Sequence, residues 1–477
     1  MSIKPLRRVL LVCLLLPFLY FGTASATYFY HVHSDVAAFG GVAMRVLPEP
    51  SAQQRIVIFS PHPDDETLGC AGLIRQAVRA GARVWVVFLT NGDAFTTAVE
   101  RQYREVRPQA EDYVRFASLR QQESRAALSR LGLPASQIRF LGFPDRGLMR
   151  LWDANWSPDA PYTSPYTRRS RVRDARSMAE GAPYCGNALL VALLEVLRDT
   201  APTDVYVTHP SDDHPDHAAA SAFVTRALDH LRAEGGLACT LRYYLVHRGD
   251  WPLPQGLRPE LLLDPPAGMR GLNTHWQARP LSRDDVRAKR RALRAYASQT
   301  AMMGRFLTSF VRRSELFGEM REPTAPRIPD GRIRLDGDRR EWGAVVPAVL
   351  DPVSDSLLRS LQQGGDVAAI YACRDTRNLY LGIAMYQSVA RGLRVRMHLR
   401  YFGDPAAGEA GGRYDVSVAA PVLPLREGRG PHLDRDWVEV AVPLREIGYA
   451  RRVAVSVDTR VAGLTVDRTG YRFLHVQ

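Results

Sequence analysis

The stretch Pro61-His62-Pro63-Asp64-Asp65-Glu66-Thr67-Leu68-Gly69 decides the fold of this chain. The apolar run Ile56-Val57-Ile58-Phe59 precedes it and a segment with helical apolar spacing follows it, which predicts a strand, a charged turn and a helix. In open α/β sheets, ligands bind in the crevice beyond the carboxyl ends of the strands, where this turn would lie. Its crowded carboxylates need a cation or protons to compensate their charge. A bound metal ion is the simplest compensation.

A second turn has the same layout. The apolar run Val205-Tyr206-Val207-Thr208 is followed by His209-Pro210-Ser211-Asp212-Asp213-His214-Pro215-Asp216-His217. Imidazole together with carboxylate favours zinc or another first-row transition metal, whereas an all-oxygen loop would favour magnesium or calcium. Three protein ligands and one water form a catalytic zinc site. The two turns therefore predict one metal site built from two strand ends.

Strand and helix patterns alternate from residue 52 to about residue 250. We predict strands over 55–59, 84–89, 138–142, 204–208 and 241–247, and helices over 67–80, 113–131, 186–199 and 216–232. This alternation is typical of an α/β fold with a doubly wound, Rossmann-like parallel sheet. The long segment 144–185 leaves the carboxyl end of a strand and is expected to border the substrate. Its aromatic residues either stack on sugar rings or pack the loop itself: Trp152, Trp156, Tyr162 and Tyr166.

The C-terminal third has a different pattern. Residues 321–331 are rich in proline and predict a linker between two separable domains. Beyond it, in residues 332–477, apolar and polar residues alternate with period two over 393–400, 437–442 and 453–457. Several such strands without a long helix predict a C-terminal antiparallel β-sandwich.

Residues 1–26 have the layout of a signal peptide: basic residues, an apolar run and Ala24-Ser25-Ala26. The alternative is an N-terminal membrane anchor, because the apolar stretch can be extended through Tyr30 to roughly the ~20 residues of a bilayer span. Both alternatives place the remainder of the chain outside the cytoplasm. We therefore expect an exported periplasmic or extracellular protein, associated with the membrane through its N-terminus in the second case.

Composition limits the classes of partner. The chain has 477 residues and is 46% hydrophobic, which fits a soluble protein of two or three domains once the leader is removed. Its net charge of +13 comes from arginine, since Lys4 and Lys289 are the only lysines, and genome composition is a sufficient cause. The charge therefore does not imply a nucleic-acid partner. Without a Cys-x-x-Cys motif, a structural zinc site is not expected.

The motifs Pro61-His62-Pro63-Asp64-Asp65-Glu66 and His214-Pro215-Asp216-His217 together resemble those of the LmbE-like (PIG-L) zinc-dependent de-N-acetylases. The resemblance covers residues 52–320 and includes Leu89-Thr90-Asn91-Gly92-Asp93, Arg120-Gln121-Gln122-Glu123 and Phe140-Leu141-Gly142-Phe143-Pro144-Asp145. Members of this family often carry histidine where Tyr296 stands. This departure concerns a contact with the substrate or with a metal ligand, and not the metal ligands themselves.

The resemblance implies a role for each matching residue. Zn²⁺ would be held by three ligands: His62, Asp65 and His217. Asp64 would be the general base, and Glu66 would orient a ligand from behind. His214 would face the developing oxyanion as an imidazolium, and a carboxylate contact from Asp216 would favour that charged form. Substrate contacts are implied for four further residues: Asn91, Asp93, Arg120 and Asp145.

The tail resembles a second family, the DOMON-like sandwiches that include the family-nine-type carbohydrate-binding modules. The resemblance rests on Ile333-Arg334-Leu335-Asp336-Gly337, Glu341-Trp342 and Asp375-Thr376-Arg377-Asn378-Leu379-Tyr380-Leu381. It implies a glycan-binding role, and a purely structural sandwich is the alternative.

Taken with these resemblances, the sequence predicts an exported zinc hydrolase that removes the N-acetyl group from an N-acetylglucosamine-type amino sugar in a glycan, glycolipid or glycoconjugate. Two other classes stay open. One is a non-catalytic glycan-binding surface protein with a vestigial metal site, although retention of Asp64 beside the ligands argues against it. The other is a metal-dependent esterase or phosphodiesterase, which release of acetate or of phosphate would distinguish.

Overall fold

A computed structural model describes residues 44–352, 363–389, 392–403, 411–419, 432–434 and 436–476. The predicted signal peptide or anchor over residues 1–26 lies outside the described residues. Among the helices of the described part, none has both the length and the apolar composition that a membrane span requires.

The N-terminal domain is built on one sheet of eight strands in the order β1-β7-β8-β6-β5-β2-β3-β4. The strands are β1 (Arg45–Val46), β2 (Arg55–Ser60), β3 (Arg83–Thr90), β4 (Ile138–Phe143), β5 (Asp204–Thr208), β6 (Thr240–Tyr244), β7 (Thr274–Pro280) and β8 (Ser314–Met320). Strands β2 to β6 pair in parallel, which confirms the predicted doubly wound core. Beyond β6 the sheet is mixed, because β8 runs antiparallel to β6 and β7. Such a mixed edge is common on α/β sheets.

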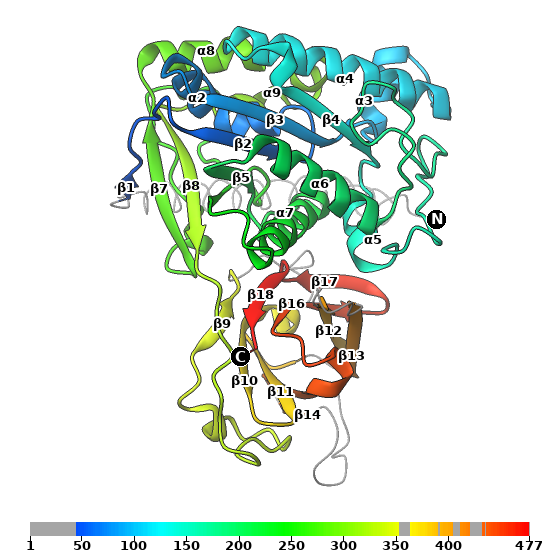
Figure 1. The fold of residues 1–477 in the computed structure, drawn as a ribbon, viewed down its shortest axis with the longest axis vertical. Helices are drawn as coiled ribbons and strands as arrows, with labels where there is room; N and C mark the ends of the chain where they lie inside the picture. Colours follow the sequence, from blue (N-terminus) through cyan, green and yellow to red (C-terminus); the bar gives the residue numbers. More distant parts are fainter. Residues whose placement is uncertain are drawn as a thin grey trace, which may run out of the picture.

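Helices cover both faces of this sheet (Figure 1). One face carries α2 (Asp65–Arg79), α4 (Ala110–Arg130), α8 (Arg283–Leu293) and α9 (Ala297–Thr308), with α3 (Thr96–Tyr103) beside them. The other face carries α5 (Leu148–Asp153), α6 (Gly186–Thr200) and α7 (Pro215–Ala233). Successive side chains of β2 point to opposite faces of the sheet. Ile56 and Ile58 pack in the core beneath α2 and α8, and Val57 and Phe59 pack in the core beneath α6 and α7.

Strand β2 lies at the centre of this arrangement, between β3 and β5. The chain runs outward from β2 through β3 to β4 and then returns to β5 on the opposite side. The order of strands therefore reverses between β2 and β5. In doubly wound sheets this reversal opens a crevice at the carboxyl ends of the two strands. The two His/Asp turns follow those two strands.

A buried ion pair contacts the backbone of α2. Glu315 of β8 accepts the backbone N–H groups of Gly72 and Leu73 at 2.7 and 2.9 Å. Lys289 of α8 donates to the carbonyl of Leu68 at 2.6 Å and to Glu315 at 2.9 Å. Both charged side chains are at most 1% exposed. The pair therefore links α2, the helix that follows the first turn, to β8 and α8.

We expect Glu315→Gln to lower the free energy of unfolding by about 3–5 kcal/mol, because it leaves the Lys289 ammonium buried without a counter-charge. Urea unfolding followed by circular dichroism measures the change. Glu319→Gln on the same strand is the matched control, since Glu319 pairs with Arg242 while 34% exposed. The control should cost no more than about 1 kcal/mol. If both variants lost the same small amount of unfolding free energy, the Glu315–Lys289 pair would not be a main support of α2.

The C-terminal domain consists of two antiparallel sheets. One has the order β14-β15-β11-β10-β9 and the other has the order β13-β12-β16-β17, with β18 also paired to β16. Their bounds are β9 (Pro347–Leu350), β10 (Val367–Arg374), β11 (Asn378–Met385), β12 (Leu393–Tyr401), β13 (Gly412–Ala419), β14 (His432–Asp434), β15 (Trp437–Pro443), β16 (Arg452–Val461), β17 (Leu464–Arg468) and β18 (Arg472–His475). Leu381 and Val440 of the first sheet share one core with Val395 and Val455 of the second. The predicted antiparallel β-sandwich is confirmed.

The segment 321–331, predicted as a linker, is largely part of this sandwich. Ala325 is fully buried in its core and donates its N–H to the carbonyl of His475 at 2.8 Å. The N–H of Ile328 donates to the carbonyl of Arg374 at 2.8 Å. Proline is compatible with pairing at the edge of a sheet, so a proline-rich composition alone does not distinguish an edge segment from a linker.

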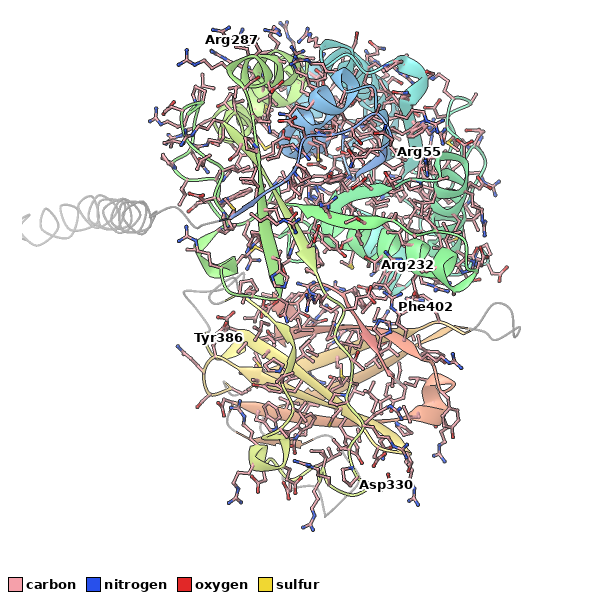
Figure 2. The ribbon with its side chains drawn as sticks, turned by 60° about the vertical axis from the view of Figure 1, so that its left-hand side comes forward. Arg55, Arg232, Arg287, Asp330, Tyr386 and Phe402 are labelled. Atoms are coloured by element: carbon pink, nitrogen blue, oxygen red, sulfur yellow. The ribbon has the colours of Figure 1, made fainter. Side chains whose placement is uncertain are left out.

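The two domains share an apolar interface. Trp152 of α5 is fully buried, and its ring packs against Phe223 of α7 and against Tyr471 of the sandwich at centroid distances of 4.9 and 5.4 Å. Figure 2 shows Phe402 at the edge of the sandwich that faces the α/β domain. Its ring lies 6.0 Å from that of Trp156, which also stacks on Phe223. Of the two alternatives for these tryptophans, packing is the one observed.

Candidate functional site

The turn after β2 holds Asp64 in an unusual backbone conformation. Its φ is 117° and its ψ is −29°, in the left-handed region where a residue with a side chain is strained by about 1–3 kcal/mol. Glu66 supports this conformation, because its Oε2 accepts the Asp64 N–H at 3.1 Å. Oε1 of Glu66 accepts the hydroxyl of Tyr296 at 2.5 Å. Tyr296 thus contacts Glu66 behind the turn.

Three ligand atoms from the two turns converge at the switch point. Nδ1 of His62 lies 3.1 Å from Nε2 of His217, and Oδ2 of Asp65 lies 3.3 and 3.1 Å from these two nitrogens. Tetrahedral coordination with bonds of about 2.0–2.1 Å would place ligand atoms about 3.3 Å apart. The two imidazoles and the carboxylate therefore fit a single small metal ion, in both donor type and spacing.

Both imidazoles are oriented from behind by carboxylates. Nε2 of His62 lies 3.2 Å from Oδ1 of Asp145, whose Oδ2 accepts the N–H of Ala94 at 2.6 Å. Nδ1 of His217 lies 3.1 Å from Oδ2 of Asp212, which accepts the backbone N–H groups of Val246 and His247, each at 3.0 Å. Carboxylates in this position fix the ring orientation and raise the basicity of a metal-binding histidine.

Other sets of ligand atoms in the described residues also lie within 4.8 Å of one another: His62, His214 and His217; Asp65, His217 and His247; and His62, Asp145 and Asp216. The last set is less free to bind an ion. Both oxygens of Asp216 already accept backbone N–H groups, from Arg146 at 2.6 Å and from Leu148 at 2.9 Å. The Nδ1 side of His62, facing Asp65 and His217, is therefore the better metal site.

Asp64 lies beside these ligands and is paired with a buried cation. Its Oδ2 accepts from Nη2 of Arg120 at 3.1 Å, and Arg120 also donates to the carbonyls of Gly92, at 2.8 Å, and Pro63. Burial raises the pKa of the Asp64 carboxyl to about 8, against the opposing effect of Arg120. Burial likewise acts on Asp145, but His62 holds the pKa of Asp145 below its ordinary value.

His214 and Asp216 differ from the expected arrangement. The Asp216 carboxylate does not reach the His214 ring; instead the backbone N–H of Asp216 donates to Nδ1 of His214 at 3.2 Å. Burial, together with the neighbouring histidines, lowers the pKa of His214 well below its ordinary value. An imidazole that accepts at Nδ1 carries no proton there, so the ring is neutral with its proton on Nε2. The predicted imidazolium is corrected to a neutral donor, and the Asp216 carboxylate anchors the loop before α5.

A cavity of about 160 Å³ opens beside this group. Of the four predicted substrate-binding residues, Arg120 and Asp145 line it, whereas Asn91 and Asp93 do not. The Asn91 side chain instead accepts from Nε2 of Gln121 at 2.9 Å, and Asp93 is buried, with a pKa raised to about 7 by burial and by Asp145. The remaining lining residues come from the two turns and from loops and helices around them: His62, Asp64, Asp65, Leu68, Phe95, Arg146, His214, His247, Gln299, Met303 and Leu307.

His247 was not predicted as a site residue. Its ring lies 4.9 Å from that of His217 and stacks on Phe306 of α9 at 5.6 Å. The sequence did contain one indication of its role. His247 is the last residue of the strand predicted over 241–247, so it falls at the same edge of the sheet as the two turns. Asp212 was part of the second turn, but nothing in the spacing distinguished it from Asp213 or Asp216.

The sandwich contacts the second turn directly. Nη2 of Arg472 donates to Oγ of Ser211 at 2.6 Å. A Cβ atom added to Gly470 would lie 1.8 Å from the carbonyl oxygen of Pro210, so the backbones approach as closely as glycine allows. On α5, Asp153 accepts from Arg468 at 2.8 Å and from the Tyr471 hydroxyl at 2.7 Å. The second turn and α5 are therefore both in hydrogen-bond contact with the C-terminal domain.

Residues 57–228 match the family model described as PIG-L: GlcNAc-PI de-N-acetylase. This match confirms the resemblance predicted for the N-terminal domain. The DOMON-like resemblance of the sandwich stays a prediction.

The chain is also similar to individual proteins. A 1D-myo-inositol 2-acetamido-2-deoxy-alpha-D-glucopyranoside deacetylase of Mycobacterium sp. (strain KMS) is 33% identical over 178 residues, which cover 37% of this chain and 50% of that protein. The protein of the same description from Corynebacterium urealyticum is 27% identical over 268 residues, covering 52% and 72%. The chain spans about half the length of the first of these relatives. Among solved structures, N,N'-diacetylchitobiose deacetylase from Pyrococcus horikoshii aligns with a TM-score of 0.35 and 17% identity over 61% of this chain and 91% of that chain.

Proposed function

We propose that this protein is a zinc-dependent hydrolase that removes the acetyl group from an N-acetylglucosamine-type amino sugar in an extracytoplasmic glycan, glycolipid or glycoconjugate. One observation carries the proposal: two imidazole nitrogens and a carboxylate oxygen converge within 3.3 Å, and a separate buried carboxylate, Asp64, lies next to them. The family match over residues 57–228 and the deacetylase relatives support the reaction class. The leader-like N-terminus supports export.

Zinc would be held by His62, Asp65 and His217 and would supply an activated water and polarisation of the amide carbonyl. The protein's own groups do the remaining work. Asp64, oriented by Arg120, accepts a proton from the attacking water and delivers it to the departing amine. His214 donates its Nε2 proton to the oxygen that gains negative charge, and the N–H of Asp216 fixes this tautomer at Nδ1.

The cavity also offers a surface for the acyl group. Leu68, Met303 and Leu307 line it beside the polar cluster. A methyl group packed against these side chains is removed from water, while the amide oxygen and nitrogen face the charged residues. This division of the cavity suits an N-acetyl group, which has one apolar end and one polar end.

A direct test measures acetate release from N-acetylglucosamine-containing glycans and, separately, cleavage of a chromogenic phosphodiester, together with the metal content of the purified protein. We expect acetate and free amine to appear in equal amounts and the phosphodiester to stay intact. Removal of the metal by a chelator should abolish the reaction, and added zinc should restore it. Undiminished activity in a protein shown to be free of metal would overturn the proposed mechanism. Cleavage of the phosphodiester without acetate release would favour the phosphodiesterase alternative.

A further inference from the structure

A second hollow lies on the sandwich, formed by strands β12, β13 and β16 and the turn before β17. Its volume is about 550 Å³, and its charged lining side chains are all arginines. They are Arg394 and Arg396 of β12 and Arg460 of β16, and the remaining lining residues are small: Gly392, Ser417, Ala462 and Gly463. All three guanidinium side chains therefore border the same open space.

The pairing of the strands places these charges next to one another. Arg394 lies directly opposite Arg460, and Arg396 lies opposite Asp458. Like charges in directly opposite positions destabilise an antiparallel pair. The fold itself gains nothing from this arrangement, whereas a bound anion would compensate it.

The nearby carboxylate does not neutralise the cluster. Asp458 is 1% exposed and accepts from Nε of Arg460 at 2.8 Å, but its other oxygen lies 2.6 Å from Nε2 of His398. Arg396 approaches the same oxygen only to 3.9 Å. Asp458 is thus the one carboxylate near Arg460 and Arg396 among the contacts of the described residues, and His398 already engages it. The hollow, which Arg394 also lines, therefore keeps an excess of positive charge.

The tryptophans of the opposite sheet offer no comparable site for a sugar ring. Trp342 and Trp437 are 3% and 2% exposed, and both indole N–H groups donate to Oε1 of Glu439, at 2.8 and 3.0 Å. Arg339 lies over the Trp437 ring at 4.7 Å. These aromatic rings are therefore engaged inside the domain.

We propose that the arginine hollow binds an acidic glycan through its carboxylate, sulfate or phosphate groups. Guanidinium forms paired, charge-assisted hydrogen bonds with such oxyanions. The volume exceeds that needed for an isolated inorganic anion and is in the range of sites that hold one or two sugar rings. A concave hollow also suits a flexible chain better than a flat layer of lipid headgroups. This inference rests on the proposed function only in that the ligand would be part of, or adjacent to, the glycan that is deacetylated.

The test uses the full-length protein and measures binding without turnover. Affinity for polygalacturonate is compared with affinity for hydroxyethyl cellulose, a neutral polymer, and for phosphatidylglycerol vesicles, at low and at high salt. The variants are Arg394→Gln and Arg460→Gln. The matched control is Arg445→Gln, which removes the same charge from a position where the side chain is 76% exposed and pairs with Glu446.

We expect the wild-type protein to bind polygalacturonate in preference to both other probes, with an affinity that falls as salt rises. Each hollow variant should bind about tenfold more weakly, as expected for loss of a charge-assisted contact. The control should bind like the wild type, and all three variants should deacetylate a small neutral sugar at the wild-type rate. Equal affinity in hollow and control variants, or a preference for vesicles, would overturn the acidic-glycan site. Neither result depends on whether the enzyme acts as a deacetylase.

Discussion

Asp64→Asn and His217→Ala are both expected to abolish deacetylation, but only His217→Ala is expected to lose the metal. Asparagine has the shape of aspartate and tolerates positive φ, so it should keep the backbone conformation of this turn. It cannot accept the proton from water, and removal of general-base help lowers turnover by ~10²- to 10⁴-fold. Loss of the His217 imidazole instead would remove one of the three proposed zinc ligands and open the coordination sphere.

Metal content by atomic absorption and turnover by acetate release separate the two effects. Asp199→Asn is a suitable control, because it makes the same chemical change at a surface carboxylate that pairs with Arg139. It should leave both quantities unchanged. Normal turnover in metal-loaded Asp64→Asn would remove Asp64 from the mechanism. Full metal content in His217→Ala would show that another residue is the third ligand, and His247 and His214 are the candidates in the neighbouring sets of ligand atoms.

The central strands could be predicted because both of their faces are buried. Residues of β2 and β3 pack against helices on each side, so these strands appear in the sequence as continuous apolar runs. Strand β8, which lies between β7 and β6, could not be predicted in the same way. Glu315 is the second residue of β8, and its burial depends on Lys289, which lies in α8, 26 residues earlier in the chain. A local pattern cannot show that such a charge is compensated.

The convergence of His62, Asp65 and His217 could be expected because two similar turns follow two apolar strands, and doubly wound sheets bring such strand ends together. The direction of each side chain within the turns could not be predicted. Asp216 and Asp212 are four residues apart in one turn, yet Asp212 faces the His217 ring while Asp216 accepts the N–H groups of the loop before α5. Those contacts depend on loops that are distant in sequence.

The separation of the two domains was predicted from composition, and their interface was not. Trp152 lies in the first domain and Tyr471 in the second, and each has an ordinary local sequence. Only the folded chain brings them to a centroid distance of 5.4 Å. Apolar residues of both domains consequently belong to one core cluster.

Removal of residues 323–477 is therefore expected to destabilise the N-terminal domain and to abolish its activity, even on a small soluble substrate. Truncation would expose the Trp152 side chain, which costs about 3 kcal/mol or more, and would leave Asp153 without Arg468 and Tyr471. It would also release Ser211 from Arg472, beside the turn that carries His217. Thermal unfolding, metal content and acetate release from an N-acetylated monosaccharide measure these effects.

Arg472→Ala tests the same contact in a chain that keeps both domains. It removes the hydrogen bond to Ser211 while the sandwich core stays complete, so we expect weaker metal binding with little change in unfolding temperature. Arg340→Ala is the control, because Arg340 pairs with Asp338 at the surface of the same domain, with its side chain 91% exposed. If the truncated chain were stable and fully active on the monosaccharide, and Arg472→Ala bound metal like Arg340→Ala, the sandwich would be an independent attachment rather than a support of the catalytic turn.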